Sequence, residues 1–499
     1  MQKQRVTPPL NSNINTTERQ QQQQDLRIAA AQSTDATMPA LEQSPINFAP
    51  DDESSMHPAY AVVFCLNYMM GSGYLTLPRA FADAGLTWGL SVLAVVAIGA
   101  TAAAECLLDC MARAGWIAAA RALPEGGGSF CRVPLDAPSP KVSRLQREAP
   151  RPVQLPDLCA LYLGDMGYAA YVTLISGYML GSLWCYAAIF AAALEANIGP
   201  HQVLYVSLFA LFVVPLSLKD LADQKTVQTL LAFGRVVMLL VMLVTALTCL
   251  YTTGPLAPMP ARTGTFDGVG ALAPVVTFSL VLHHSVPQIV APVKIRQEFD
   301  KNVVFRRAFL VACVLYALFA APVANFFGDS TKSAANLGWA TYHHVHDASD
   351  PRDALKSHLI YYLGQFVVLY PAVNVLATYP LNVITFGDAL LAAHRRFKEN
   401  GEVSSLPPSR RSVRVARLCA AVPPLVGACI QPDISRITNV TGCFGLFLCA
   451  VVPGVLALAA RKLAPGPTEH ASLLNGRAAA TLLVVAGGAL TAGSLVAAL

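Results

Sequence analysis

Long apolar runs separated by short polar connections fill the chain from residue 57 onward. A helix needs about 20 mainly apolar residues to cross the hydrocarbon core of a membrane. Eleven such runs are present, at 57–82, 86–112, 167–195, 201–218, 224–252, 268–293, 303–327, 357–388, 412–430, 433–460 and 477–498. None shows the period-two alternation of a barrel strand, and only helices and closed barrels satisfy their main chain in lipid. The pattern therefore predicts an all-α, polytopic membrane protein with eleven transmembrane helices.

Composition supports a lipid environment and divides the chain into three parts. Of the 499 residues, 54% are hydrophobic and 13% are charged, whereas a soluble domain carries about 25% charged residues. Residues 1–56 are polar and predict a disordered cytoplasmic tail. Residues 57–460 predict a core of ten helices, and 461–499 the eleventh transmembrane helix and the C-terminus. The net charge of +5 is spread over short clusters between apolar runs, so no nucleic-acid partner is expected.

The loop charges predict an orientation. Lys and Arg concentrate in segments 113–153, 294–307 and 394–417, which all fall on one side if eleven helices are counted. The opposite loops are poorer, since 196–200 has neither residue and 253–267 has only Arg262. Because Lys and Arg are retained on the cytoplasmic side, we expect a cytoplasmic N-terminus. The membrane is expected to be the plasma membrane or a lysosome- or vacuole-like endomembrane.

The first apolar run contains Gly71-Ser72-Gly73 near its centre. Each glycine costs a helix about 1 kcal/mol relative to alanine. Glycines spaced Gly-x-x-x-Gly let two helices approach, but the Gly-x-Gly spacing here puts the glycines on different faces. This favours an unwound segment, whose free main-chain groups are tolerated in a membrane only where they line a cavity or bind something.

The sixth run is also interrupted, by Pro274, Pro287 and Pro292 and by the polar pair His283-His284. A proline inside a helix removes a hydrogen bond and clashes with the preceding turn. Transporters built from inverted repeats carry broken helices at corresponding positions of their two halves, with the substrate between them. If helices one to five and six to ten are the repeats, the first helix of each half is broken.

Several motifs occur in a fixed order. The segment from Asn67 to Gly85 contains an Asn, then Gly-Ser-Gly, Leu-x-x-Pro and Ala-Phe. Further motifs are Phe327-Gly328-Asp329, the TYPL of Thr378 to Leu381, and Pro432-Asp433-Ile434. Over about residues 57–460 they resemble the amino acid/auxin permease (AAAP) family, the amino acid transporter transmembrane domain, of the amino acid–polyamine–organocation superfamily. His284 to Pro287 and Val422-Pro423-Pro424 are most similar to an orphan branch whose substrates are poorly defined.

The resemblance implies a five-plus-five inverted-repeat (LeuT-like) fold with eleven helices. It also implies a secondary active transporter of amino acids, working by alternating access and coupled to protons or sodium. A non-transporting amino acid sensor or receptor at the membrane is the alternative, because broken helices would look the same in both. No enzyme is expected, since the bundle shows no nucleophile–base pair, metal-ligand motif or phosphate loop. The expected partners are an amino acid and the lipid bilayer, with no cofactor or metal besides the coupling ion, H+ or Na+.

An amino acid presents one carboxylate and one ammonium, and unwound helices present groups for both. Half-helix N-termini offer amides and positive dipole ends to the carboxylate, whereas half-helix C-termini offer carbonyls to the ammonium or to a cation. We expect residues 71–73 to bind the carboxylate and 277–279 the ammonium. For Thr277 and Ser279, a hydroxyl bonded back to its own helix explains the sequence equally well. The substrate-binding candidates are Gly71, Ser72, Gly73, Thr277, Phe278, Ser279 and His283.

The coupling ion has candidates of two kinds. The resemblance to sodium-coupled relatives implicates Asn67 and Thr378 in sodium binding, and hard cations prefer oxygen ligands. An Asn67 bonded to the main chain is the alternative. His283 and His284 are proton candidates, because histidine titrates near physiological pH, and a buried histidine bonded to the main chain is the alternative for each. The ion-coupling candidates are Asn67, Thr378 and His284.

Charged residues inside the apolar runs invite a structural interpretation. Arg235 lies about eleven residues into the fifth run and is expected to extend toward the cytoplasm, an inner gate being the alternative. Glu105 and Asp109 lie one helical turn apart, with Arg113 one turn further. This spacing predicts a salt-bridged helix face at the membrane interface.

Overall fold

The computed structural model describes residues 57–121, 154–219, 225–260, 270–291, 301–345, 351–398 and 408–498. The chain divides into two units, Met1–Asn47 and Phe48–Leu499, and all described residues belong to the second. They form helices joined by turns, with no strand among them, which confirms the predicted all-α class. The expected tail, 1–56, lies outside the described residues.

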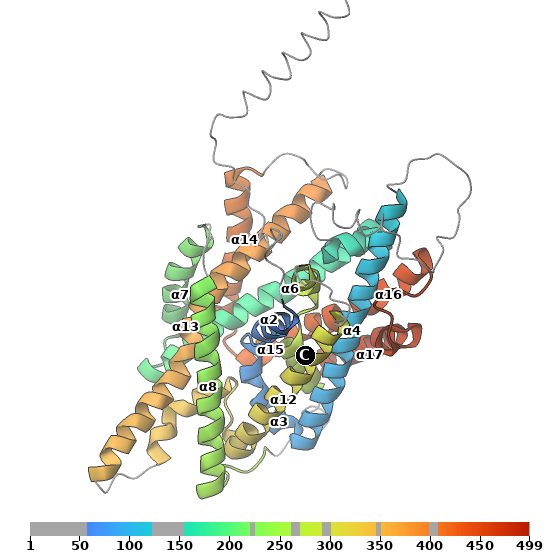
Figure 1. Cartoon of the computed structure of the whole chain (residues 1–499). Coiled ribbons are helices and arrows are strands. Elements are labelled where there is room, and N and C mark those ends of the chain that lie inside the picture. Colours follow the sequence, from blue (N-terminus) through green and yellow to red (C-terminus); the bar gives the residue numbers. More distant parts are fainter. Residues whose placement is uncertain are drawn as a thin grey trace, which may run out of the picture. The chain divides into compact units, whose positions relative to one another are not determined.

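Each of the eleven apolar runs coincides with helical structure. The helices are α2 (Pro58–Met69), α3 (Leu77–Ala84), α4 (Leu86–Arg121), α6 (Leu155–Ile198), α7 (Gln202–Ser217), α8 (Lys225–Thr252), α10 (Leu272–Leu280), α11 (Val286–Val290), α12 (Lys301–Phe327), α13 (Pro351–Lys398), α14 (Arg410–Ile430), α15 (Ile434–Leu446), α16 (Val452–Leu463) and α17 (Arg477–Ala498) (Figure 1). Nine segments of the described chain are long and apolar enough to cross a membrane, whereas Pro58–Met69 and Gln202–Ser217 are shorter apolar helices. The protein is therefore a multi-pass membrane protein, and eleven crossings stay a prediction.

Both predicted interruptions are present. α2 ends at Met69, and a 3-10 turn, η1 (Gly73–Thr76), leads into α3. α10 ends at Leu280, after which Val281 is extended and a 3-10 turn, η2 (His283–Ser285), leads into α11. Pro287 lies in the first turn of α11, where its missing amide proton costs no hydrogen bond. It therefore starts the second half of this helix, and the chain breaks six residues earlier, at Val281.

The third apolar run begins earlier than predicted. α6 starts at Leu155 instead of 167, because two helical pieces join across a kink at Gly164. Gly164 has φ 69° and ψ −165°, a conformation that only glycine adopts without strain. Near the other end of the chain, α15 and α16 are joined by a π-helical turn, η5 (Phe447–Val451).

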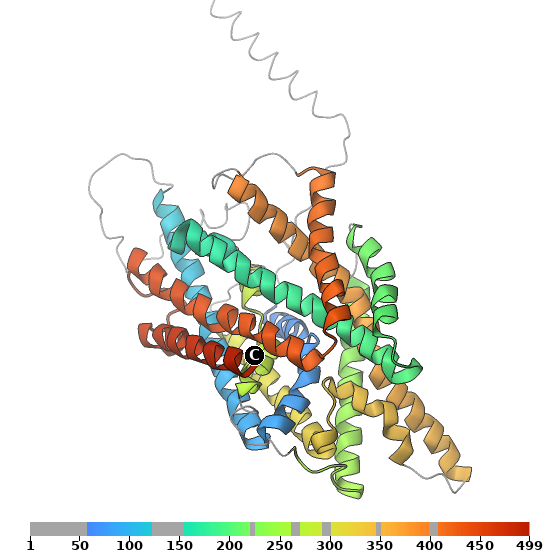
Figure 2. The same ribbon diagram turned by 180° about the vertical axis from the view of Figure 1, so that it is seen from behind.

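α10 lies in the interior of the helical unit, and all nine of its residues are buried. It packs against α4, α15 and η1, while α4 packs against α12. α16 and α17 lie side by side, in red at the C-terminal end of the colour bar (Figure 2). The contact of α10 with α15 requires Gly442, because a Cβ there would overlap the main chain of Pro274. Tyr251, Ile430 and Leu211 are instead exposed on outer helices, as expected for surfaces covered by lipid.

The acidic residues of α4 are buried in ion pairs. Glu105 accepts from Arg306 Nε at 2.5 Å, and Asp109 accepts from Arg113 Nε at 3.1 Å and from Arg461 Nη2 at 2.8 Å. Both carboxyl groups are fully buried. The predicted ion pairing is thus confirmed. Partners from α12 and α16 cover this face of α4, and no spacing within α4 reveals them. The position of these pairs at the membrane interface stays a prediction.

Replacing Asp109 with Asn should destabilise the protein strongly. The change leaves the buried guanidinium groups of Arg113 and Arg461 without a counter-charge, which costs about 3–5 kcal/mol. Asp165→Asn is the matched control, because Asp165 is 82% exposed and pairs only at the surface with Arg396, which is worth about 0–1 kcal/mol. Unfolding temperatures of the purified variants in detergent measure both, and equal shifts would contradict the structural role of Asp109.

Candidate functional site

The break after α2 frees main-chain groups. The amides of Met70 and Gly71 turn back to donate to the carbonyls of Leu66 and Met69, each at 2.8 Å. In an unbroken helix, the amide of Gly71 would instead reach the carbonyl of Asn67. Among the described residues, the amide of Ser72 donates to no main-chain carbonyl. The 3-10 turn that leads into α3 therefore begins at an amide that has no main-chain partner.

The break after α10 frees carbonyl groups. The amide of Val281 closes the last turn by donating to Thr277 O at 2.9 Å. The carbonyl of Ser279 accepts from the hydroxyl of Tyr316 at 3.0 Å. Within the described chain, the carbonyls of Phe278 and Val281 accept from no main-chain amide. The C-terminal end of α10 thus presents acceptors and the negative end of a helix dipole.

Gly73 brings the two breaks together. A Cβ at Gly73 would lie 2.8 Å from Cδ1 of Phe278 and 3.1 Å from Cα of Ser279, so only a glycine fits without a shift. The hydroxyl of Ser279 donates to Val275 O at 3.0 Å. It is thus bonded back to its own helix, which is the alternative to ligand binding that the sequence left open. Thr277 behaves differently, because its buried hydroxyl has no hydrogen-bond partner in the described structure.

Aromatic and polar side chains surround the breaks. Ser285 Oγ donates to the hydroxyl of Tyr68 at 2.7 Å, and that hydroxyl lies 2.7 Å from His284 Nε2. The ring of Tyr178 in α6 is tilted against both His284 and Phe278, with ring centroids 5.7 and 5.9 Å apart. Of these residues, the sequence singled out His284 and Phe278 as site candidates. Tyr68 follows Asn67 directly in sequence. Its hydroxyl lies beside the second break because the tertiary structure brings α2 and η2 together, which the sequence does not predict.

There is space beside Gly71. A Cβ at this position would meet only the hydroxyl of Tyr186, at 3.8 Å. Asn382 Nδ2 donates to the same hydroxyl at 3.5 Å, and Ser72 Oγ points to Cys185 Sγ at 3.9 Å. Residues 71 and 72 therefore face α6 rather than pack tightly against it.

His283 faces away from the breaks. Its Nε2 lies 2.8 Å from the carbonyl oxygen of Ala100 in α4. Its ring stacks on Phe309 of α12, with centroids 5.7 Å apart. This is the arrangement of a buried histidine bonded to the main chain. Substrate binding by His283 stays a prediction, while the structure places its neighbour His284 on the side of Tyr68.

Arg235 binds one of the two residues expected to bind sodium, Asn67, and a neighbour of the other, Asn374. Its Nη1 donates to Asn67 O at 3.1 Å and to Asn67 Oδ1 at 3.0 Å, and its Nη2 donates to Asn374 Oδ1 at 3.1 Å. The hydroxyl of Thr378 donates to Asn374 O at 3.0 Å. The expectation that Arg235 extends toward the membrane surface is wrong, because its side chain is 5% exposed and bonds inward.

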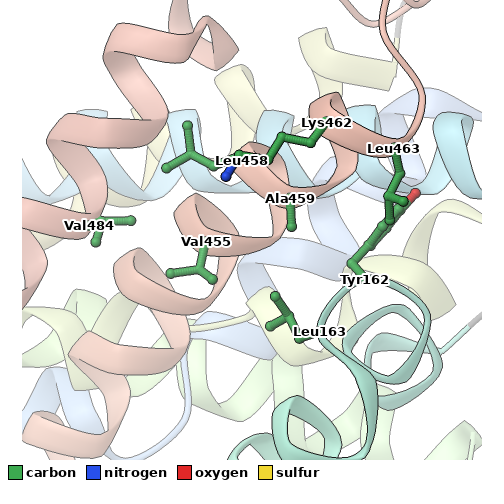
Figure 3. A pocket seen from close by; sticks show the side chains of 8 residues that line it. All are labelled: Tyr162, Leu163, Val455, Leu458, Ala459, Lys462, Leu463 and Val484. Atoms are coloured by element: carbon green, nitrogen blue, oxygen red, sulfur yellow. The ribbon is translucent and has the colours of Figure 1, made fainter.

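Two cavities of the described structure are of note, a groove away from the breaks and a small cavity beside η1. A groove of about 510 Å³ lies between α6 and the pair α16 and α17, with Tyr162 and Leu163 facing Val455, Leu458 and Ala459 (Figure 3). It is mostly apolar, with Lys462 at its edge. A smaller cavity of about 30 Å³ is lined by the following residues of α3, α10 and α15 and their flanks: Thr76, Arg79, Ala80, Asp83, Ala271, Val275, Ser435, Thr438 and Asn439.

Known proteins similar to this chain share a name that describes membrane location. "Transmembrane protein 104 homolog" of Dictyostelium discoideum is 21% identical over 459 residues, covering 83% of this chain and 90% of that protein. "Transmembrane protein 104" of Homo sapiens is 23% identical over 456 residues, covering 80% and 87%. No family model matches the chain. The resemblance to the amino acid/auxin permease family is therefore corrected: the similar proteins carry another name, and only the orphan character of the branch fits.

Among solved structures, mutants of a manganese transporter from Eremococcus coleocola are similar to this chain. Two of them superpose with TM-scores of 0.44 and 0.45 at 13% identity, covering 90% of this chain and 97% of theirs. A TM-score at this level does not establish a common fold, and manganese belongs to those transporters.

Substitutions at Gly73 and Gly71 should have different effects on stability. Gly73→Ala forces η1 away from Phe278 and Ser279, and such overpacking costs about 1–3 kcal/mol. Gly71→Ala meets only Tyr186 at van der Waals distance and should be tolerated. Thermal unfolding of both purified variants tests this pair. A Gly73→Ala protein as stable as Gly71→Ala would show that the breaks do not adjoin as described.

Proposed function

We propose that the protein is a secondary active transporter that moves neutral amino acids across a membrane by alternating access, coupled to protons or sodium. The observation that carries this proposal is the close approach of the two breaks at Gly73. A free amide at Ser72 thereby lies in the same region as the free carbonyls of Phe278 and Val281. These groups suit the two charged ends of an amino acid, because the amide attracts a carboxylate and the carbonyls attract an ammonium.

The side chains around the breaks support a neutral substrate. Tyr68, Tyr178 and Tyr186 contribute hydroxyls and apolar rings, and Phe278 adds another ring. Among the described residues that adjoin the breaks, only Arg235 is permanently charged, and Asn67 and Asn374 engage its guanidinium. An ammonium on the substrate side chain would thus be buried without an opposite charge, which is costly, and a side-chain carboxylate would find Nη1 and Nη2 of Arg235 already engaged by Asn67 and Asn374.

The breaks also supply hinges. α2 and α3 are joined by only a few residues, as are α10 and α11, so each half-helix can tilt against its partner while the main-chain groups stay in place. Alternating access in transporters with broken helices uses such movements around a central site. On the charges of its loops, we place the N-terminus in the cytoplasm.

Purified protein in liposomes should take up at least one neutral amino acid. A panel of labelled amino acids, tested separately under sodium and pH gradients, measures the rate against protein-free liposomes. Cationic amino acids should be taken up more slowly, because no opposite charge awaits their side chains. Binding without uptake would indicate a sensor, whereas neither binding nor uptake of any amino acid would overturn the proposal.

Gly71→Val should abolish substrate binding while the protein stays folded. The added methyl groups fill the space toward Tyr186, which the proposal assigns to substrate. Gly488→Val in α17 is the control, because nothing lies within 4 Å of a Cβ at that position. Equilibrium binding of the labelled amino acid, together with size-exclusion profiles, distinguishes lost affinity from misfolding. Unchanged affinity in Gly71→Val would place the substrate elsewhere.

A further inference from the structure

Arg235 is a buried cation surrounded by neutral groups. Its side chain is 5% exposed, and within the described chain its guanidinium donates only to Asn67 and Asn374. Its Nε has no partner there, and no carboxylate of the described residues pairs with it. A charge placed inside a membrane protein is costly and marks a functional position. The groups that bind the Arg235 guanidinium therefore indicate what the positive charge does at this position.

The oxygens around Arg235 form a ligand set for a hard cation. Asn67 contributes a carbonyl and an amide oxygen from α2, and Asn374 contributes an amide oxygen from α13. Thr378, one turn along α13, brings its hydroxyl to the carbonyl of Asn374. Neutral oxygens of this kind are what hard cations prefer. Here the cation that they bind is a guanidinium.

The break in α2 is what exposes the first of these ligands. Because the amide of Gly71 donates to Met69 O, the carbonyl of Asn67 is left for Arg235. It lies in the last turn of α2, where the helix dipole is negative. A positive charge at this point therefore both replaces a lost hydrogen bond and balances the end of the helix.

We propose that Arg235 is a built-in cation that occupies a set of oxygen ligands suited to a sodium ion, those of Asn67 and Asn374, and that it makes this site independent of sodium. This inference rests on the proposed transport function, because an ion site matters for coupling only in a protein that transports its ligand. The guanidinium joins α8 to α2 and α13. A sodium ion bound to the same oxygens would join only α2 and α13. The guanidinium of Arg235 supplies a fixed positive charge at this site.

One consequence is that a cation site can be opened by mutation. Arg235→Ala removes the donors and leaves the oxygens of Asn67 and Asn374 facing the vacated volume. A sodium ion is small enough to enter this volume and offers the charge that was lost. Arg235→Lys keeps a positive charge in the same place and should leave the site closed to sodium.

The test measures thermal unfolding of purified protein in detergent, with sodium chloride replaced stepwise by choline chloride or potassium chloride at constant ionic strength. Wild type and Arg235→Lys should unfold at the same temperature in all three salts. Arg235→Ala should unfold at a lower temperature in choline and recover part of the loss as sodium rises, with saturation. Adding Asn374→Leu to Arg235→Ala should remove this recovery, and Lys462→Ala should behave as wild type.

A saturable, sodium-specific rise in the unfolding temperature of wild type would overturn the proposal. So would a well-folded Arg235→Ala protein on which sodium has no effect. If Arg235→Ala does not fold, the comparison of wild type with Arg235→Lys decides, since both must then be insensitive to sodium. No amino acid is present in this experiment, so a failure of the transport proposal and a failure of this one are seen separately.

Discussion

A membrane offers no water to a polar group of the main chain, and every break in a buried helix must therefore be satisfied by the protein itself. The two breaks of this chain show how that is done. The carbonyl of Asn67 is met by Arg235, and the carbonyl of Ser279 by Tyr316. Among the groups with no main-chain partner in the described part of the chain are the amide of Ser72 and the carbonyls of Phe278 and Val281, which lie in the buried interior where helices from both halves meet.

Close approach of main chains makes this interior possible. Gly73 admits Phe278 and Ser279 to van der Waals distance, and Gly442 does the same for Pro274. α10 is thereby held between η1 and α15 with every residue buried. In lipid, such packing of small residues takes over the part that hydrophobic association plays in water. The two breaks are thereby held next to each other by a contact that only glycine permits.

Among the described residues, buried charged groups are prominent in two places, and only the first contains carboxylates. Around Glu105 and Asp109, two carboxylates pair with three guanidinium groups and tie α4 to α12 and α16. Around Arg235, the partners are neutral oxygens, and the positive charge persists. The first arrangement suits a permanent structural contact. The second leaves a net positive field beside the breaks, where an anionic group of a ligand would be attracted.

The sequence by itself determined the helical class, the places of the apolar runs and the existence of both breaks, because periodicity, glycine and proline act locally. It also singled out Asn67, Thr378 and His284. Only the tertiary structure decided that Arg235 lies between Asn67 and Asn374, that His283 bonds to Ala100 instead of facing the breaks, and that Tyr68 reaches His284. These partners are distant in sequence and come from different helices. No spacing along one helix could reveal them, since the orientation of a buried side chain depends on which neighbouring helix offers it a partner.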